Sequence, residues 1–216
     1  MKEDAAFEKE KKRKLSAAEE KRMARFEALC AEMAEKGYQK RDLTVGIVKA
    51  NVITLLLAIP ICAAVILLFR LVQPEARIFL TGRELILWLL LFFALTAVHE
   101  GIHGLTWSRF TPNGFRDIDF GFMKEYLTPY CTCCAPLSRG AYVAGSLMPL
   151  IVLGLIPAVV AVFSGSALLL ALALVMILAA GGDVLIVLTL LRHGAKAREQ
   201  LIYDHPTRAG CVVFEK

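Results

Sequence analysis

Long apolar segments dominate the chain after residue 44, and they predict transmembrane helices. Each segment reaches about 20 residues, the length that a helix with a rise of 1.5 Å per residue needs to cross a bilayer core of roughly 30 Å. The second segment reaches this length only because it continues from Leu85–Val98 through the polar stretch His99–His103. The four predicted spans are Val45–Phe69, Glu84–His103, Ala141–Phe163 and Ala167–Leu191.

The third and fourth segments are connected only by Ser164–Gly165–Ser166. A connection this short predicts a tight antiparallel pair of helices. The third segment also contains Pro149 and Pro157 together with Gly145 and Gly154. Proline bends helices and glycine lets neighbouring helices approach, so we expect this segment to be kinked and closely packed within a bundle.

Residues 1–44 have a different pattern, with many charges and no long apolar run. They predict a helix from Ala17 to Lys36 that is terminated by Gly37. Because the rest of its surface is charged, we expect a cytoplasmic helix that rests on the protein or on lipid headgroups. Acidic residues are interleaved with the basic ones and aromatic residues are scarce, which argues against nucleic acid as a partner. The narrow apolar stripe of this helix consists of Phe26, Leu29, Cys30 and Met33.

The composition agrees with a membrane protein that has charged parts outside the bilayer. Hydrophobic residues make up 57% of the chain and charged residues 21%, and both fractions can hold only when the two classes are segregated along the sequence. A disordered chain is excluded, because disorder requires low hydrophobicity. The net charge of +5 is moderate, and basic residues beside transmembrane helices usually indicate the orientation of the protein in the membrane.

The Lys and Arg residues near the spans predict that both termini and the 108–139 loop lie in the cytoplasm, with the protein in the cell membrane. The six cysteines then face a reducing compartment or lipid, so a disulfide framework is not expected. The predicted fold class is an all-α polytopic membrane protein with about four transmembrane helices. Its three parts are a charged cytoplasmic helical segment (1–44), a four-span membrane domain (45–192) and a cytoplasmic tail (193–216).

The second span carries the sequence His99-Glu100-Gly101-Ile102-His103. Positions i and i+4 lie on one face of a helix, so both imidazoles can converge on one metal ion. Glu100 is offset by one residue and reaches the open coordination position, where it can take a proton from water. This is the H-E-x-x-H arrangement of zinc peptidases. Ionisable residues within a span are costly and indicate a functional site, whereas the alternative is a polar cluster hydrogen-bonded to the loop.

A catalytic zinc site needs a third protein ligand, and Asp183 in the fourth span is the best candidate. The second and fourth spans run in the same direction across the membrane. His99 lies 15 residues after Glu84, and Asp183 lies 16 residues after Ala167. At 1.5 Å per residue both side chains are expected roughly 22–24 Å along their helices, at about the same depth.

Gly181 and Gly182 precede Asp183 and would let the neighbouring helices approach closely. Two alternatives for Asp183 are an ion pair with Arg192 and a hydrogen bond inside the bundle. The tail turn Asp204-His205-Pro206 can fold back towards the site, although a structural role is at least as plausible. The other possible ligands are Asp204, His205, Cys131, Cys133 and Cys134.

The loop between the second and third spans contains a period of two, in which Ile118, Phe120 and Phe122 alternate with Asp117, Asp119 and Gly121. This pattern predicts a short strand after the turn at Pro112-Asn113-Gly114. An exposed strand edge beside the metal is able to hold an extended substrate by strand addition. The alternative is a strand that merely covers the membrane surface. The cysteines at 131, 133 and 134 lack the paired C-x₂-C spacing of structural zinc sites.

Over about Lys36–Glu215 the chain resembles a family of bacterial membrane proteins described as "putative zincin peptidase", a group long labelled as a domain of unknown function. More distantly it is similar to site-2-type intramembrane proteases, which have a His/Glu helix, an intervening helix and an Asp helix in this order. The motifs that carry the resemblance are Gly37-Tyr38, Asn51, His99-Glu100-x-x-His103, Tyr130-Cys131, Ala135-Pro136-Leu137, Pro149, Pro157, Gly181-Gly182-Asp183 and Asp204-His205-Pro206-Thr207.

The resemblance implies a membrane-embedded metallopeptidase, with zinc held by His99, His103 and Asp183 and with Glu100 as the catalytic base. The usual Asp-Gly pair of site-2-type proteases is Asp183-Val184 in this chain. The expected activity is hydrolysis of a peptide bond in or next to the membrane, with Zn²⁺ as cofactor and with membrane lipid and a protein or peptide substrate as partners. The alternative is a non-catalytic metal-binding membrane protein, such as a scaffold or transporter accessory.

Overall fold

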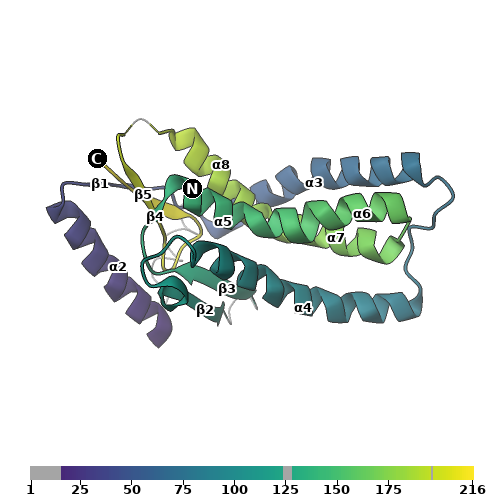
Figure 1. The fold of residues 1–216 in the computed structure, drawn as a ribbon, viewed down its shortest axis with the longest axis horizontal. Helices are drawn as coiled ribbons and strands as arrows, with labels where there is room; N and C mark the ends of the chain where they lie inside the picture. The colour runs from purple at the N-terminus through teal and green to yellow at the C-terminus, as the bar shows by residue number, and fades with distance from the viewer. Residues whose placement is uncertain (1–15, 124–127, 196) are drawn as a thin grey trace.

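The computed structural model describes residues 16–123, 128–195 and 197–216, which form a long helical bundle with a smaller strand-containing end (Figure 1). Helix α7 packs against α3, α4 and α6, while α5 packs against α4 and α8 packs against α3. A π-helical segment, Leu150–Leu155, joins α5 to α6. The helices of the bundle are α3 (Ile47–Val72), α4 (Gly82–Trp107), α5 (Arg139–Pro149), α6 (Ile156–Ser164), α7 (Ala167–Ala179) and α8 (Gly181–His193).

Three helical stretches are long and apolar enough to cross a membrane, namely Val48–Val72, Gly82–Trp107 and Arg139–Ser164. These agree with the first three predicted spans, and they fit a membrane protein. The fourth predicted span is broken, because α7 and α8 meet at Ala180 with a bend of 41°. The bent pair makes a fourth span if it is counted as one.

The third span is bent in the way its proline and glycine content predicts. Pro149 ends α5, and the following turn widens into a π-helix before α6 begins. Gly165 then adopts a left-handed φ of 68° and ends α6 just before α7 starts. The predicted tight helix pair is therefore confirmed.

Strands occupy the other end of the molecule, so the all-α prediction is wrong although the protein is mostly helical. One antiparallel sheet has the strand order β1-β6-β5-β4, and a separate hairpin pairs β2 with β3. β2 confirms the strand predicted in the 108–139 loop. The sheet joins segments about 170 residues apart in sequence, and such pairings leave no local pattern. The strands are β1 (Gln39–Asp42), β2 (Ile118–Met123), β3 (Thr128–Cys133), β4 (Leu137–Ser138), β5 (Gln200–Asp204) and β6 (Cys211–Glu215).

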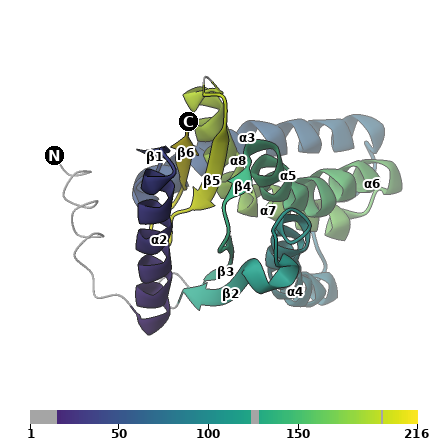
Figure 2. The ribbon, with the colours of Figure 1, turned by 60° about the vertical axis from the view of Figure 1, so that its left-hand side comes forward.

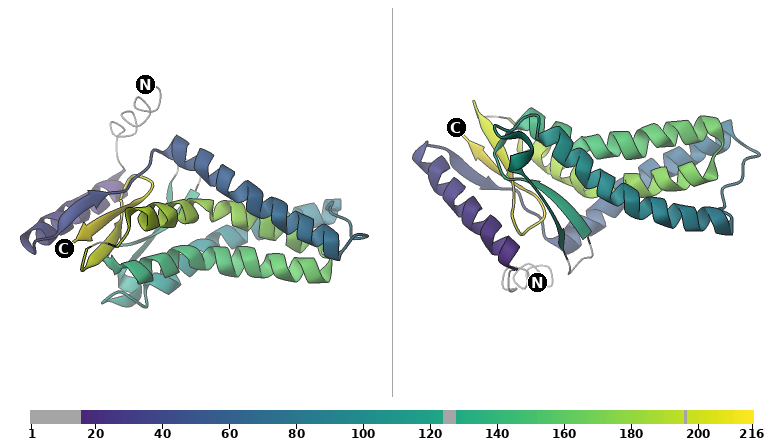
Figure 3. Two further views of the ribbon diagram at one scale, coloured as in Figure 1. Left: turned by 90° about the horizontal axis from the view of Figure 1, so that it is seen from above. Right: turned by 60° about the horizontal axis from the view of Figure 1, so that its bottom comes forward.

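The four-stranded sheet lies between the bundle and helix α2 (Ala17–Glu35), as Figures 2 and 3 show. Alternate residues of β5 and β6 face opposite sides, so both faces of the sheet are buried. Tyr203, Val212 and Phe214 face α2, where they pack against Phe26 and Met33. The predicted helix and its apolar stripe are thus confirmed. The stripe packs against the sheet of the protein itself.

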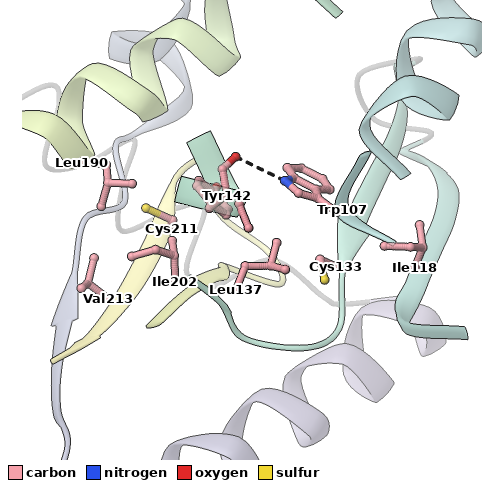
Figure 4. Packing of buried hydrophobic residues seen from close by; sticks show 10 residues of the cluster. Trp107, Ile118, Cys133, Leu137, Tyr142, Leu190, Ile202, Cys211 and Val213 are labelled. Atoms are coloured by element: carbon pink, nitrogen blue, oxygen red, sulfur yellow. Dashed lines mark hydrogen bonds between the residues drawn. The ribbon is translucent and has the colours of Figure 1, made fainter. Parts of the chain in front are cut away.

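The other face of the sheet forms the main core at the end of the bundle (Figure 4). Its residues come from α4, α5, α8, the hairpin and the tail strands, so this core fixes the hairpin and the tail against the helices that carry the predicted site. Its largest members are Trp107, Ile118, Leu137, Tyr142, Leu190 and Ile202. All six cysteines are free thiols, and Cys133 and Cys211 are buried in this region.

Candidate metal centre

Helix α4 places His99 and His103 on one face near its carboxyl end. Both side chains are buried, and their Nε2 atoms lie 3.2 Å apart. The helix starts with a capping box, in which the Thr81 side chain accepts from the Glu84 N–H and the Glu84 carboxylate accepts from the Thr81 N–H. It then continues without a break to Trp107, so the polar stretch keeps the i, i+4 geometry that brings the two rings together.

Helix α8 brings Asp183 to the same place. Its Oδ2 atom lies 3.2 Å from His99 Nε2, and its Oδ1 atom lies 3.5 Å from His103 Nε2. The break at Ala180 puts Asp183 in the first turn of α8, where the helix dipole favours a negative charge. A Cβ at Gly181 would overlap the Thr54 methyl group of α3, so this glycine permits the close packing that positions the turn. The common depth expected from the sequence is therefore observed.

The ligand groups of His99, His103 and Asp183 form a triangle whose spacing fits a tetrahedral metal ion. Zinc bonds of about 2.0–2.1 Å to nitrogen and oxygen separate two ligands of a tetrahedron by roughly 3.3–3.4 Å. The contacts between these groups measure 3.2, 3.2 and 3.5 Å, with the Asp183 oxygens Oδ2 and Oδ1 facing His99 and His103 respectively, and they fall close to this separation. One ligand atom from each residue lies within 4.8 Å of the other two. Within the described part of the chain, His99, His103 and Asp183 are the one group of three or more His, Cys, Asp or Glu side chains that could hold a metal.

The hydrogen-bond partner of His103 sets the direction of its lone pair. Its Nδ1 lies 2.9 Å from the Gly145 carbonyl oxygen, which can only accept, so Nδ1 carries the proton and Nε2 of the neutral ring is an acceptor. That acceptor faces the carboxylate of Asp183 and the ring of His99. An Nε2 acceptor and a carboxylate gathered in this way repel one another unless a cation, either a proton or a metal ion, lies between them, so this set of groups fits a bound metal.

A stack of aromatic rings supports His103 from behind. The Trp107 ring lies 5.0 Å from the His103 ring at 15°, and the Tyr142 ring lies 5.8 Å beyond it at 20°. The indole N–H donates to the Tyr142 carbonyl at 3.3 Å, as Figure 4 shows. A Cβ at Gly145 would overlap the indole, so the close approach of α5 to α4 depends on this glycine. Trp107 continues the i+4 series from His99 and His103, a signal that the sequence analysis missed.

Glu100 lies beside the triangle without belonging to it. It lines the same pocket as the three candidate ligands, and its carboxylate accepts a hydrogen bond from the Cys131 backbone of β3. The pocket has a volume of about 370 Å³ and is also lined by β3 and by the 204–210 loop. A carboxylate in this position is able to exchange a proton with a molecule held at the three ligands.

The tail residues weighed as third ligands have other partners. Asp204 accepts hydrogen bonds from Tyr142 Oη at 2.6 Å and from Thr132 Oγ1 at 3.3 Å, and burial raises the pKa of its carboxyl group. His205 Nδ1 accepts from the Thr207 N–H at 3.2 Å, and burial together with the Arg208 charge lowers the pKa of this ring to about 4. Both side chains line the pocket but lie outside the group of convergent ligand atoms.

The loop cysteines also lie outside that group. Burial raises the pKa values of the Cys133 and Cys134 thiols to about 12, and it raises the pKa of Cys131 as well. Metal ligation requires the thiolate form, which these surroundings disfavour. The Cys134 thiol instead donates to Asp119 at 3.1 Å.

Comparison with known proteins agrees with this geometry. No curated protein and no solved structure matches the chain. A family model matches residues 92–198, a range that contains the carboxyl half of α4 and all of α8. Both histidines, Glu100 and Asp183 therefore fall within the matched segment. The family resemblance drawn from the sequence motifs is thus confirmed: residues 92–198 match the model of the family described as "putative zincin peptidase".

Proposed function

We propose that the protein is a membrane-embedded zinc metallopeptidase that hydrolyses a peptide bond in or next to the membrane. The observation that carries the proposal is the triangle of ligand groups contributed by His99, His103 and Asp183, whose contacts measure 3.2–3.5 Å. The family match supports the peptidase class. The length and apolar character of the helices support the membrane location.

Each residue has a separate part in the proposed reaction. The three ligands would hold zinc, which when bound polarises a carbonyl group and makes water more acidic. Glu100 would accept a proton from the attacking water and deliver it to the leaving amine. His103 keeps its ring orientation through Gly145, so its lone pair stays directed at the metal position.

The outer edge of β3 is the surface that we assign to the substrate. The Cys134 N–H donates to the Asp117 carbonyl at 2.7 Å, which fixes the register of the hairpin. In this register the backbone groups of Cys131 point away from β2, because bonded and non-bonded pairs alternate in an antiparallel ladder. An extended peptide that pairs with this edge would lie next to Glu100.

The orientation remains a proposal based on the distribution of Lys and Arg, which places both termini in the cytoplasm. His99 lies 17 residues after Gly82, so the centre is roughly 26 Å from the start of α4 and close to its other end. Water would then reach the polar pocket from the cytoplasmic side. A polar cavity is needed for a peptide backbone to be hydrolysed at membrane depth.

The test compares Glu100→Gln with wild type in the full chain reconstituted with zinc, using a library of quenched fluorescent peptides. We expect the variant to retain about one zinc per chain and to lose roughly 10²–10⁴-fold in kcat/KM, the usual contribution of a general base. Unchanged activity in Glu100→Gln would overturn the assignment of the base. Stoichiometric zinc without hydrolysis by the wild type would instead favour a non-catalytic metal-binding membrane protein.

A further inference from the structure

We propose that the amino-terminal half of α2 is a lid over the pocket that contains the candidate metal centre, and that Arg22 is the latch that holds this lid closed. The lid itself is inferred from contacts outside the membrane spans. Its consequence, control over peptide entry, rests on the proposed function.

Helix α2 is part of the pocket wall although it is far from the centre in sequence. Glu19 and Arg22 line the cavity that also contains His99, Glu100 and Asp183. Figures 1 and 2 show α2 at the strand-containing end, beside the hairpin and the tail strands. A molecule that approaches Glu100 from this end meets α2 first.

Arg22 connects two walls of the pocket. Its guanidinium group lies 4.5 Å from the centre of the Tyr130 ring on β3 and donates a hydrogen bond to the Tyr130 hydroxyl group. Its Nε donates to the Pro206 carbonyl of the 204–210 loop at 3.3 Å. Because Tyr130 and Pro206 come from different walls, one side chain bridges the mouth between them.

Arg25, almost one helical turn further on, makes a second contact with the hairpin. Its Nη1 lies 2.9 Å from Asp119 Oδ2 on β2, and 44% and 41% of the two side chains are exposed. Exposed ion pairs of this kind contribute little stability and weaken with salt. The contact between Arg25 and Asp119 is therefore easily replaced by water.

The carboxyl half of α2 is attached in a different way. Phe26 and Met33 are each only 5% exposed and belong to the apolar cluster with Tyr203, Val212 and Phe214. Apolar burial is stronger than such exposed ion pairs and is not weakened by the screening effect of salt. When the polar contacts break, α2 is thus expected to pivot about Phe26 while its carboxyl half stays on the sheet.

The native thiols give a direct test that requires neither zinc nor substrate. Cys131 lines the same pocket as Arg22, Cys211 is buried in the main core, and Cys30 lies in the carboxyl half of α2 against the sheet. The full chain in lipid nanodiscs is treated with a small maleimide, and labelling at each cysteine is followed over time by peptide mass spectrometry. Wild type is compared with Arg22→Ala.

We expect Arg22→Ala to speed the labelling of Cys131 by at least roughly 5-fold, because it removes the two hydrogen bonds, to Tyr130 and Pro206, that hold the closed state. Labelling of Cys30 and Cys211 should not change. Tyr130→Phe, which keeps the ring but removes the hydroxyl group, should give a smaller increase. Lys21→Ala is the matched control, because it removes one positive charge from an exposed neighbouring position and should leave Cys131 unchanged.

Three results would overturn the lid: unchanged labelling of Cys131 in Arg22→Ala, an equal increase in Lys21→Ala, or an equal increase at Cys211, which would mean that α2 holds the whole fold. If Arg22→Ala does not fold, the same comparison is made with Tyr130→Phe. The two proposals are tested by different measurements. Absence of peptide hydrolysis by the wild type would contradict the proposed function, whereas unchanged thiol labelling would contradict the lid.

Discussion

The Nδ1 atom of His103 lies 2.9 Å from the carbonyl oxygen of Gly145, so the backbone of α5 orients a candidate metal ligand on α4. Histidines that bind metals commonly donate their second N–H to a carbonyl or carboxylate in this way. Gly145 has a second role, because Trp107 occupies the space where its Cβ would be. One glycine therefore allows both the hydrogen bond and the aromatic stack behind the ring.

Replacing this glycine should damage both features. Gly145→Ala forces α5 away from the indole, so we expect a loss of about 1–3 kcal/mol in stability, as for other overpacked sites. Zinc affinity should fall by roughly 10–100-fold, because the orientation of His103 is lost. Thermal unfolding and a chelator competition titration measure the two effects.

Gly140→Ala is the control for this change, since Gly140 lies in the same helix and a Cβ there meets nothing within 4 Å. This variant should keep wild-type zinc affinity and be as stable as wild type or slightly more so, because alanine favours helix more than glycine does. Equal behaviour of the two variants would show that the space around Gly145 is not critical.

The third ligand is tested by comparing two aspartates of the same pocket. Asp183→Ala removes a corner of the triangle, so zinc affinity should fall by more than the roughly 100-fold that loss of a supporting residue can cause. Asp204→Asn should retain about one zinc per chain, because Asp204 lies outside the group of ligand atoms. Zinc affinity is read by chelator competition, with circular dichroism as the check on folding. The opposite ranking of the two variants would assign the third ligand to the tail.

His205 predicts a pH dependence of stability at the strand-containing end. Burial and the charge of Arg208 lower its folded-state pKa from 6.5 to about 4. Between these two values the unfolded chain binds a proton that the folded chain does not, so stability falls as the pH decreases through this range.

His205→Gln removes this titration. The stability of wild type relative to the variant should therefore be greatest above pH 6.5 and should decline towards pH 4, the range between the ordinary and the folded-state pKa. Thermal unfolding of both proteins over this range gives the difference. Parallel profiles would show that His205 does not titrate as its surroundings indicate.

The sequence predicts those parts of the structure in which apolar or functional residues recur at a regular spacing. The apolar runs predict the helices, and the alternation from Asp117 to Phe122 predicts β2. The i, i+4 spacing of His99 and His103 predicts that their rings meet, and the depth argument brings Asp183 to them. Each of these features follows from a local period or from counting residues along a single helix.

The four-stranded sheet could not be predicted from such local patterns. β1 has the sequence Gln39-Lys40-Arg41-Asp42, which shows no apolar alternation, and it is a strand because it pairs with Cys211–Glu215 at the other end of the chain. The break at Ala180 is equally hidden, because an apolar run gives no sign of a change in helix direction. The contacts of Arg22 with Tyr130 and Pro206 are also set by tertiary structure, so the charged surface of α2 gives no sign of them in the sequence.

X-ray absorption at the zinc edge of the purified, zinc-loaded full chain tests the central claim most directly. We predict about one zinc per chain, with the scattering of two imidazole rings, nitrogen and oxygen ligands at about 2.0–2.1 Å and no sulfur. Absence of bound zinc, or sulfur scattering at about 2.3 Å, would contradict a centre built from His99, His103 and Asp183.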